Sequence, residues 1–173
     1  MLKFIMHLLP ENISDLTEIV ICDSESALQA HRELFRFSKR SYISSDNMDN
    51  AFPLVLSLVD TCNASASCPT RIHLAFGWEN MLRVATWMTD LSSVKDTFIV
   101  LKNAGVTESV LIPFAASPAG DLFPYLYYGK RLDVLKKICI IARKQVESRV
   151  KKSPVRVDCH IITSSHHVVA SSL

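Results

Sequence analysis

Three stretches of the chain repeat one arrangement of apolar and polar residues. They begin at Leu28, Leu82 and Leu132, and each has apolar residues at its first, third, seventh and tenth positions and a small residue at its eleventh. Steps of three and four residues place most of these side chains on one face of an α-helix. The pattern therefore predicts three similar helices, and the small eleventh residue lets a neighbouring helix approach closely.

A second apolar helix is predicted after each of the first two stretches, at residues 49–59 and 103–114. In the later copy, Gly105 is placed to end one helix in a left-handed conformation, and Thr107 or Val106 begins the next. A further apolar helix is predicted at residues 2–9. Each unit is therefore expected to run helix, gap, helix.

The segment from Glu79 to Ala115 resembles an armadillo or HEAT-like repeat. The likeness is carried by the helical pattern of residues 82–92, by the apolar segment of residues 98–106 with its glycine, and by the apolar helix that ends at Phe114. The copies that begin at Leu28, Leu82 and Leu132 are 54 and 50 residues apart, longer than the about 40 to 47 residues usual in such repeats.

The resemblance implies an all-α fold, a short right-handed α-solenoid of two to three armadillo/HEAT-like repeats. We expect a helical repeat domain at residues 1–152 and a loosely ordered C-terminal tail at residues 153–173. The chain would then be a piece of a longer repeat array. An irregular helical bundle is the first alternative and an α/β fold the second, because the β-branched runs at residues 16–23, 97–100 and 155–162 have the composition of strands.

Asp23 is the candidate on which an α/β enzyme would depend. It follows the apolar run Ile19–Ile21 and resembles the strand-to-helix carboxylate turn of ribonuclease H domains, where it would hold a divalent metal. The competing interpretation is that Asp23 or Ser24 caps the helix that begins near Ser26. No second strand that ends in a carboxylate accompanies it, so we expect no catalytic site.

Cysteine and histidine positions suggest neither a disulfide framework nor a metal site. The five cysteines are widely spread and are expected as reduced thiols, although Cys62 and Cys68 are close enough to bridge in an oxidising compartment. A zinc site from residues 159–160 with 166–167 matches no closed tetrahedral spacing. His31 and His73 are expected to be partly buried, each with one satisfied nitrogen. We therefore predict no metal and no cofactor.

Glycine is scarce, with four residues in the chain, which disfavours a phosphate-cradling loop. No apolar run reaches the about 18 residues that cross a bilayer, and the N-terminal residues lack a cleavage pattern. These features predict an intracellular protein, cytoplasmic or nuclear.

A basic segment is the most informative functional feature. Residues 130–152 carry nine basic residues against Asp133 and Glu147, a local charge of +7, in a chain whose net charge is +2. Such asymmetry attracts acidic partners. We expect a protein–protein interaction scaffold that binds a protein or acidic peptide, with nucleic-acid binding by residues 130–152 as the alternative. The candidate contacts are Lys136, Lys137, Arg143, Lys144, Trp87 and Trp78.

Overall fold

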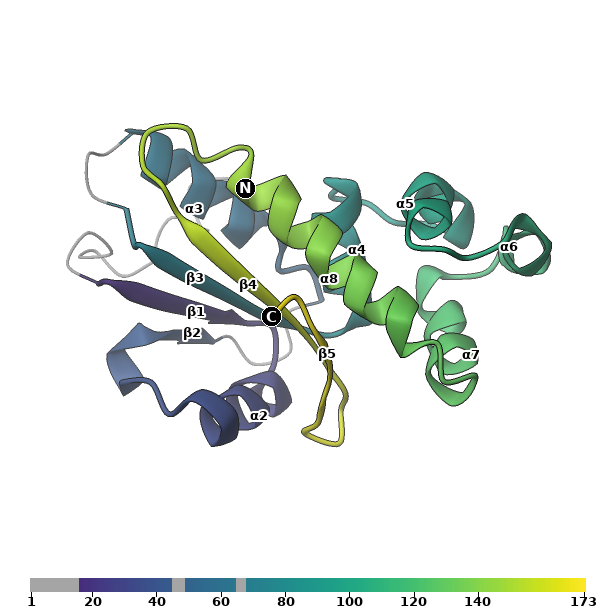
Figure 1. Ribbon diagram of the computed structural model, residues 1–173, viewed down its shortest axis with the longest axis horizontal. Coiled ribbons are helices and arrows are strands. Elements are labelled where there is room, and N and C mark those ends of the chain that lie inside the picture. The colour runs from purple at the N-terminus through teal and green to yellow at the C-terminus, as the bar shows by residue number, and fades with distance from the viewer. Residues whose placement is uncertain (1–15, 45–48, 65–67) are drawn as a thin grey trace.

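The computed structural model describes residues 16–44, 49–64 and 68–173. A five-stranded sheet runs through the middle of the molecule in the order β2-β1-β3-β4-β5 (Figure 1). Strands β1 to β4 are parallel, and β5 pairs antiparallel with β4. The strands are β1 (Glu18–Cys22), β2 (Tyr42–Ser44), β3 (Arg71–Phe76), β4 (Arg156–Ile162) and β5 (Val168–Ser171).

Helices cover both faces of this sheet. Helix α2 lies on one face, whereas α3, α4 and α8 lie on the other, and α5, α6 and α7 extend beyond the sheet beside the N-terminal end of α8 (Figure 1). The helices are α2 (Glu25–Phe35), α3 (Phe52–Ala64), α4 (Trp78–Thr86), α5 (Phe98–Asn103), α6 (Glu108–Phe114), α7 (Leu122–Tyr128) and α8 (Leu132–Glu147), with short 3-10 turns η2 (Lys39–Ser41), η3 (Val94–Thr97) and η4 (Ala119–Asp121).

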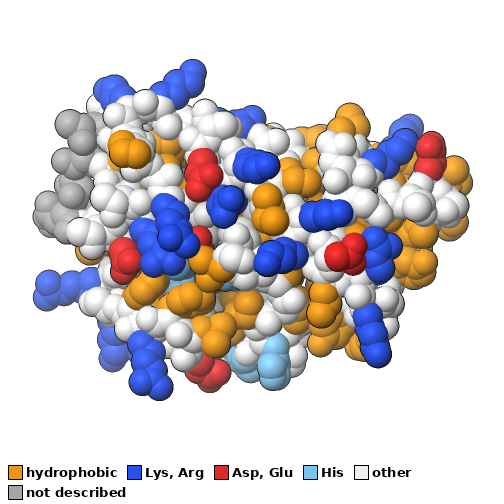
Figure 2. Space-filling model, in the orientation of Figure 1, with side chains coloured by type: hydrophobic (Ala, Val, Ile, Leu, Met, Phe, Trp, Pro, Cys, Tyr) orange, Lys and Arg blue, Asp and Glu red, His pale blue; other side chains and the backbone are white. Residues whose placement is uncertain are grey.

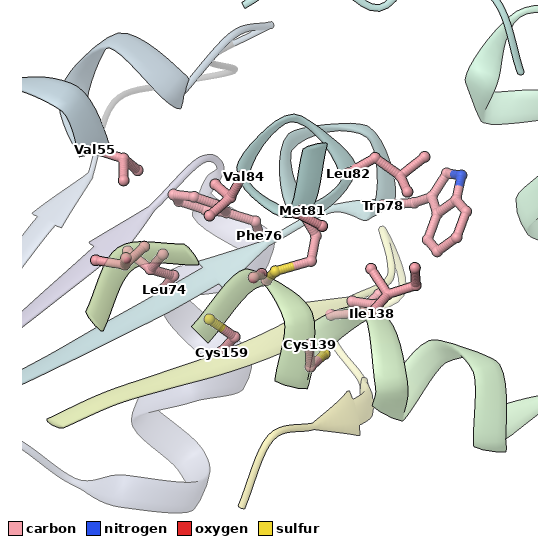
Figure 3. Close-up of a cluster of buried hydrophobic side chains, with 14 of the residues drawn as sticks. Val55, Leu74, Phe76, Trp78, Met81, Leu82, Val84, Ile138, Cys139 and Cys159 are labelled. Carbon is pink, nitrogen blue, oxygen red and sulfur yellow. The ribbon is translucent and has the colours of Figure 1, made fainter. Parts of the chain in front are cut away.

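The larger core lies between the sheet and helices α3, α4 and α8. Leu74 and Phe76 of β3 belong to the same buried cluster as Met81 of α4 and Ile138 of α8 (Figure 3). A smaller core on the opposite face joins Val20, Cys22 and Ala75 to Ala27 and Ala30 of α2. Alternate residues of one strand therefore serve different cores, as the pleat of a strand requires.

The prediction of an all-α solenoid is wrong, because the molecule is built on a sheet. The stretches that begin at Leu28, Leu82 and Leu132 start in helices α2, α4 and α8, but only the third lies wholly in its helix, because α2 ends at Phe35 and α4 ends at Thr86. They do not stack as repeats, because α2 packs on the face of the sheet opposite to α4 and α8 (Figure 1). Helical periodicity reports only that a helix has a buried side, and this side can face a sheet as well as another helix.

The α/β alternative describes the fold class. Two of its three proposed runs are strands, β1 and β4, whereas residues 97–100 lie in the 3-10 turn η3 and helix α5. Residues predicted as a loose tail form the strands β4 and β5, so one sheet crosses the boundary proposed at residues 152 and 153. Strand β1 is buried and apolar on both sides, so it lacks the alternation that reveals a half-exposed strand.

Several local predictions are confirmed. Ser24 is the N-cap of α2, and its hydroxyl accepts from the backbone N–H of Ala27. Gly105 adopts a φ of 100° between α5 and α6, and Thr107 is the N-cap of α6. The helix predicted at residues 2–9 lies outside the described residues.

Cys62 and Cys68 form a disulfide, contrary to the expectation of five reduced thiols. Cys22, Cys139 and Cys159 are free and buried.

None of the helices in the described part of the chain is long and apolar enough to span a membrane.

Candidate functional site

The predicted basic segment forms the outer face of α8 and the turn that follows it. The opposite face of α8 is buried against the sheet through Leu135, Ile138 and Ala142. Lys136, Lys137 and Lys144 are consequently exposed. Figure 2 shows Lys and Arg side chains distributed across the surface over α8.

The two acidic residues of this segment are engaged in ion pairs. Asp133 pairs with Arg131 at 3.0 Å, and Glu147 lies 3.8 Å from the Nε of Arg143 while accepting the backbone N–H of Val157. No carboxylate of the described residues lies within ion-pairing distance of the three exposed lysines of α8. Their charges therefore remain available to a partner.

Arg143 differs from those lysines. Its Nη1 donates to the backbone carbonyl of Ser172 at 3.1 Å, which fastens the C-terminal strand to α8. We therefore assign Arg143 a structural contact in addition to its charge.

A pocket of about 510 Å³ lies at the C-terminal end of this basic surface. Its apolar part is formed by Leu56, Val59 and Trp87, and its basic residues are Arg149, Lys151 and Lys152; Asp60 and Asn63 complete the lining. We call this site the Trp87 pocket. It combines apolar surface with three positive charges and a single carboxylate.

The Trp87 pocket is held in shape by contacts between distant segments. The Arg149 guanidinium lies 4.0 Å from the centroid of the Trp87 ring, a cation–π geometry. Asn63 Nδ2 donates to the carbonyl of Arg149, and Asn63 Oδ1 accepts from the backbone N–H of Lys151, both at 2.8 Å. These bonds join the end of α3 to the turn after α8, so the pocket exists before any partner binds.

The two predicted tryptophans have different environments. Trp87 is partly buried in its pocket, where its ring meets Phe52 nearly at right angles. Trp78 is only 6% exposed, and its indole N–H donates to the carbonyl of Ala119 at 2.9 Å. Trp78 is therefore a core residue and is unsuited to anchor a partner.

Asp23 directly follows the carboxyl end of β1. The strand order changes direction here, because β2 lies on one side of β1 and β3 lies on the other. This is the position at which open α/β sheets usually bind ligands. Its Oδ2 accepts from the backbone N–H of Gly77 at 2.7 Å and from Asn80 Nδ2 at 2.9 Å, and its Oδ1 accepts from the Ser24 hydroxyl. Burial raises the pKa of Asp23, opposed by these hydrogen bonds.

The edge around Asp23 does not assemble a carboxylate metal site. Asp49 and Glu79 line the adjacent crevice of about 410 Å³. Within the described ranges, however, the only group of three potential metal ligands consists of histidines elsewhere in the fold. The geometry therefore assigns Asp23 to the hydrogen bonding of the edge and gives no support to metal-dependent catalysis there.

The histidine group is a feature that the sequence did not predict. His31 of α2, His73 of β3 and His160 of β4 are all fully buried, between α2 and the sheet. His31 Nε2 lies 3.1 Å from His73 Nδ1, which lies 3.2 Å from His160 Nε2. Burial lowers the pKa of His31 and His73 to about 3 and that of His160 to about 4, so the rings are neutral at pH 7.

The zinc ligands considered from the sequence are not brought together. Cys159 points into the core beneath α8, whereas its neighbour His160 points to the α2 face. His166 and His167 are exposed in the turn between β4 and β5. The alternation of His73 in β3, and of Asp158 and His160 in β4, with apolar residues was the only signal for the histidine group, and it does not reveal which strands are neighbours.

No protein-family model, curated protein or solved structure matches this chain. The fold defines its class as an open, mostly parallel α/β sheet covered by helices on both faces.

Proposed function

We propose that this protein is an interaction module that binds an acidic segment of a partner protein through the basic face of α8 and the Trp87 pocket. The observation that carries the proposal is the pocket itself, with apolar surface next to Arg149, Lys151 and Lys152. Lys136, Lys137 and Lys144 extend the positive surface along α8. An acidic peptide with one apolar side chain matches this combination of charge and shape.

A peptide suits the site better than a nucleic acid. Single-stranded nucleic acids are held by bases stacked on exposed aromatic rings. The Arg149 guanidinium already covers the Trp87 ring, and Phe52 contacts it as well. The exposed residues Tyr125 and Tyr128 lie on α7, near the other end of α8. The Trp87 pocket therefore supplies positive charge and apolar contact without a free stacking surface.

The direct test uses an acidic peptide rich in glutamate that carries one leucine. Binding is followed by tryptophan fluorescence, because Trp87 lies in the pocket whereas Trp78 is buried elsewhere. We expect affinity to fall as salt is added, since exposed charges are screened within about 8 Å at physiological ionic strength. Peptides without leucine should bind more weakly.

Charge reversal locates the site. The double variant Lys151→Glu/Lys152→Glu should weaken the peptide about tenfold or more, which corresponds to about 1.4 kcal/mol. The matched control is Lys39→Glu/Arg40→Glu, which makes the same charge change in the exposed turn η2. If both double variants lost the same peptide affinity, the effect would come from net charge and not from this site. Tighter binding of single-stranded RNA than of the peptide would contradict the proposal.

A further inference from the structure

Three imidazole nitrogens from separate segments converge in the interior of the protein. His31, His73 and His160 each place one ring nitrogen within 4.8 Å of the other two. The two shorter separations, 3.1 and 3.2 Å, both involve His73 Nδ1. For comparison, two nitrogens bound to one tetrahedral zinc ion at its usual bond length are about 3.3 Å apart. Two of the three separations thus match those of a coordination shell, and the third, which is within 4.8 Å, would have to shorten when an ion binds.

Hydrogen bonding alone leaves this group incomplete. A neutral imidazole nitrogen carries either one proton or one lone pair. His73 Nδ1 faces both His31 Nε2 and His160 Nε2, so it completes a full hydrogen bond with only one of them. On the outer sides of the rings, His73 Nε2 and His160 Nδ1 have no hydrogen-bond partner among the described residues. Buried polar atoms without partners are rare in folded proteins.

A metal ion at the centre would use the three inward lone pairs together. The outer nitrogens would then carry the protons, and two of them face oxygen atoms. His31 Nδ1 lies 3.0 Å from the Tyr42 hydroxyl, and His73 Nε2 lies 3.8 Å from Asp158 Oδ2. Metal-bound histidines commonly direct their second nitrogen towards such an oxygen.

The surroundings favour one class of metal. Asp158 is fully buried and is held by Arg71 at 2.8 Å and Arg156 at 3.3 Å, so it stays in the outer shell. The rings of Phe35 and Phe37 pack around the histidines. Three imidazoles in apolar surroundings suit zinc or copper, whereas magnesium and calcium prefer oxygen ligands.

We propose that His31 Nε2, His73 Nδ1 and His160 Nε2 form a binding site for a transition-metal ion, Zn²⁺ foremost. The ion would connect α2 to β3 and β4 across the smaller core. Because all three histidines are fully buried, its role is structural. The group contains no fourth His, Cys, Asp or Glu ligand among the described residues, so the remaining coordination position would be taken by a small non-protein ligand such as water. The site is independent of the Trp87 pocket.

The test begins with the full chain freed of metal by a chelator and shown to remain folded by circular dichroism. Zinc titration followed by mass spectrometry of the native protein should give one ion per chain, and the melting temperature should rise with zinc concentration. If the folded, metal-free chain did not bind one zinc ion, the proposal would be overturned.

Variants then assign the site. His160→Gln should abolish stoichiometric binding, whereas His166→Gln/His167→Gln, in the exposed turn, should leave it unchanged. Tyr42→Phe removes only the hydroxyl beside His31 and should weaken zinc about 10- to 100-fold, as outer-shell changes do. Binding lost with the exposed pair and retained in His160→Gln would assign the ion to the surface and contradict the proposal.

A measurement on the unaltered protein avoids the risk that a variant fails to fold. Long-range proton–nitrogen NMR spectra distinguish the two nitrogens of each imidazole. Zinc should shift the Nδ1 resonance of His73 and the Nε2 resonances of His31 and His160. These are the nitrogens that face one another at the centre of the group. Shifts confined to His166 and His167 would refute the site.

Discussion

Substitution of Asp23 separates the effect of its charge from that of its hydrogen bonds. The side chain is 6% exposed, and Oδ2 accepts from the backbone N–H of Gly77 and from Asn80 Nδ2. In Asp23→Ala, the amide of Gly77 loses the acceptor shown for it, at a cost of about 1 to 3 kcal/mol, and Asn80 loses one hydrogen bond of about 0.5 to 1.5 kcal/mol. We expect the free energy of unfolding to fall by about 2 to 4 kcal/mol.

Asp23→Asn is the matched variant. Its amide oxygen can occupy the position of Oδ2 and accept the same two bonds, and its volume is nearly unchanged. Because burial raises the pKa of Asp23, the charged carboxylate is disfavoured in the folded state at neutral pH. Removal of the charge is therefore expected to change stability by less than about 1 kcal/mol.

The sign of the pH effect follows from the same shift. A carboxyl group with a raised folded-state pKa binds its proton more readily in the folded state than in the unfolded state. Its contribution opposes folding at neutral pH and is relieved as the pH falls through the folded-state pKa. On acidification, the free energy of unfolding of the wild type should therefore rise relative to that of Asp23→Asn, because the variant has no carboxyl group to protonate.

Urea unfolding followed by circular dichroism measures both variants under identical conditions. Asp121→Ala, at an exposed residue of the turn η4, controls for loss of an acidic side chain. If Asp23→Asn lost as much stability as Asp23→Ala, the charge rather than the hydrogen bonds would hold the edge together. If neither lost stability, the contacts at Gly77 and Asn80 would be dispensable.

Two further predictions concern the core and the cysteines. Ile138→Ala should cost about 2 to 5 kcal/mol of unfolding free energy in the same urea assay, because Ile138 is fully buried on the inner face of α8. The control Ile112→Ala, at 61% exposure, should cost less than about 0.5 kcal/mol. Equal costs would contradict the packing described. Iodoacetamide without a reductant should leave the native protein unlabelled, because burial raises the pKa of the free thiols, and should label three cysteines after unfolding. Five labels would disprove the disulfide. The three thiols expected to react are those of Cys22, Cys139 and Cys159.

The sequence alone determined the local features of this protein. Ser24 caps α2 and Gly105 turns the chain between α5 and α6, because each effect depends on residues only a few positions away. The basic residues of α8 face outward for a similar reason, since the apolar positions of the same helix define its buried side. The same periodicity predicted the start of α8 at Leu132, whereas α4 begins earlier than predicted, at Trp78, and already ends at Thr86.

Only the tertiary structure decided what those helices pack against and which side chains meet. A parallel sheet brings together strands separated by long stretches of chain, and the pattern of residues within one strand does not reveal which strand lies beside it. His31, His73 and His160 are 42 and 87 residues apart, and they converge because β3 lies between β1 and β4. The Trp87 pocket likewise requires that the end of α3 meet the turn after α8. Such long-range pairings depend on the packing of the whole chain, which local propensity does not encode.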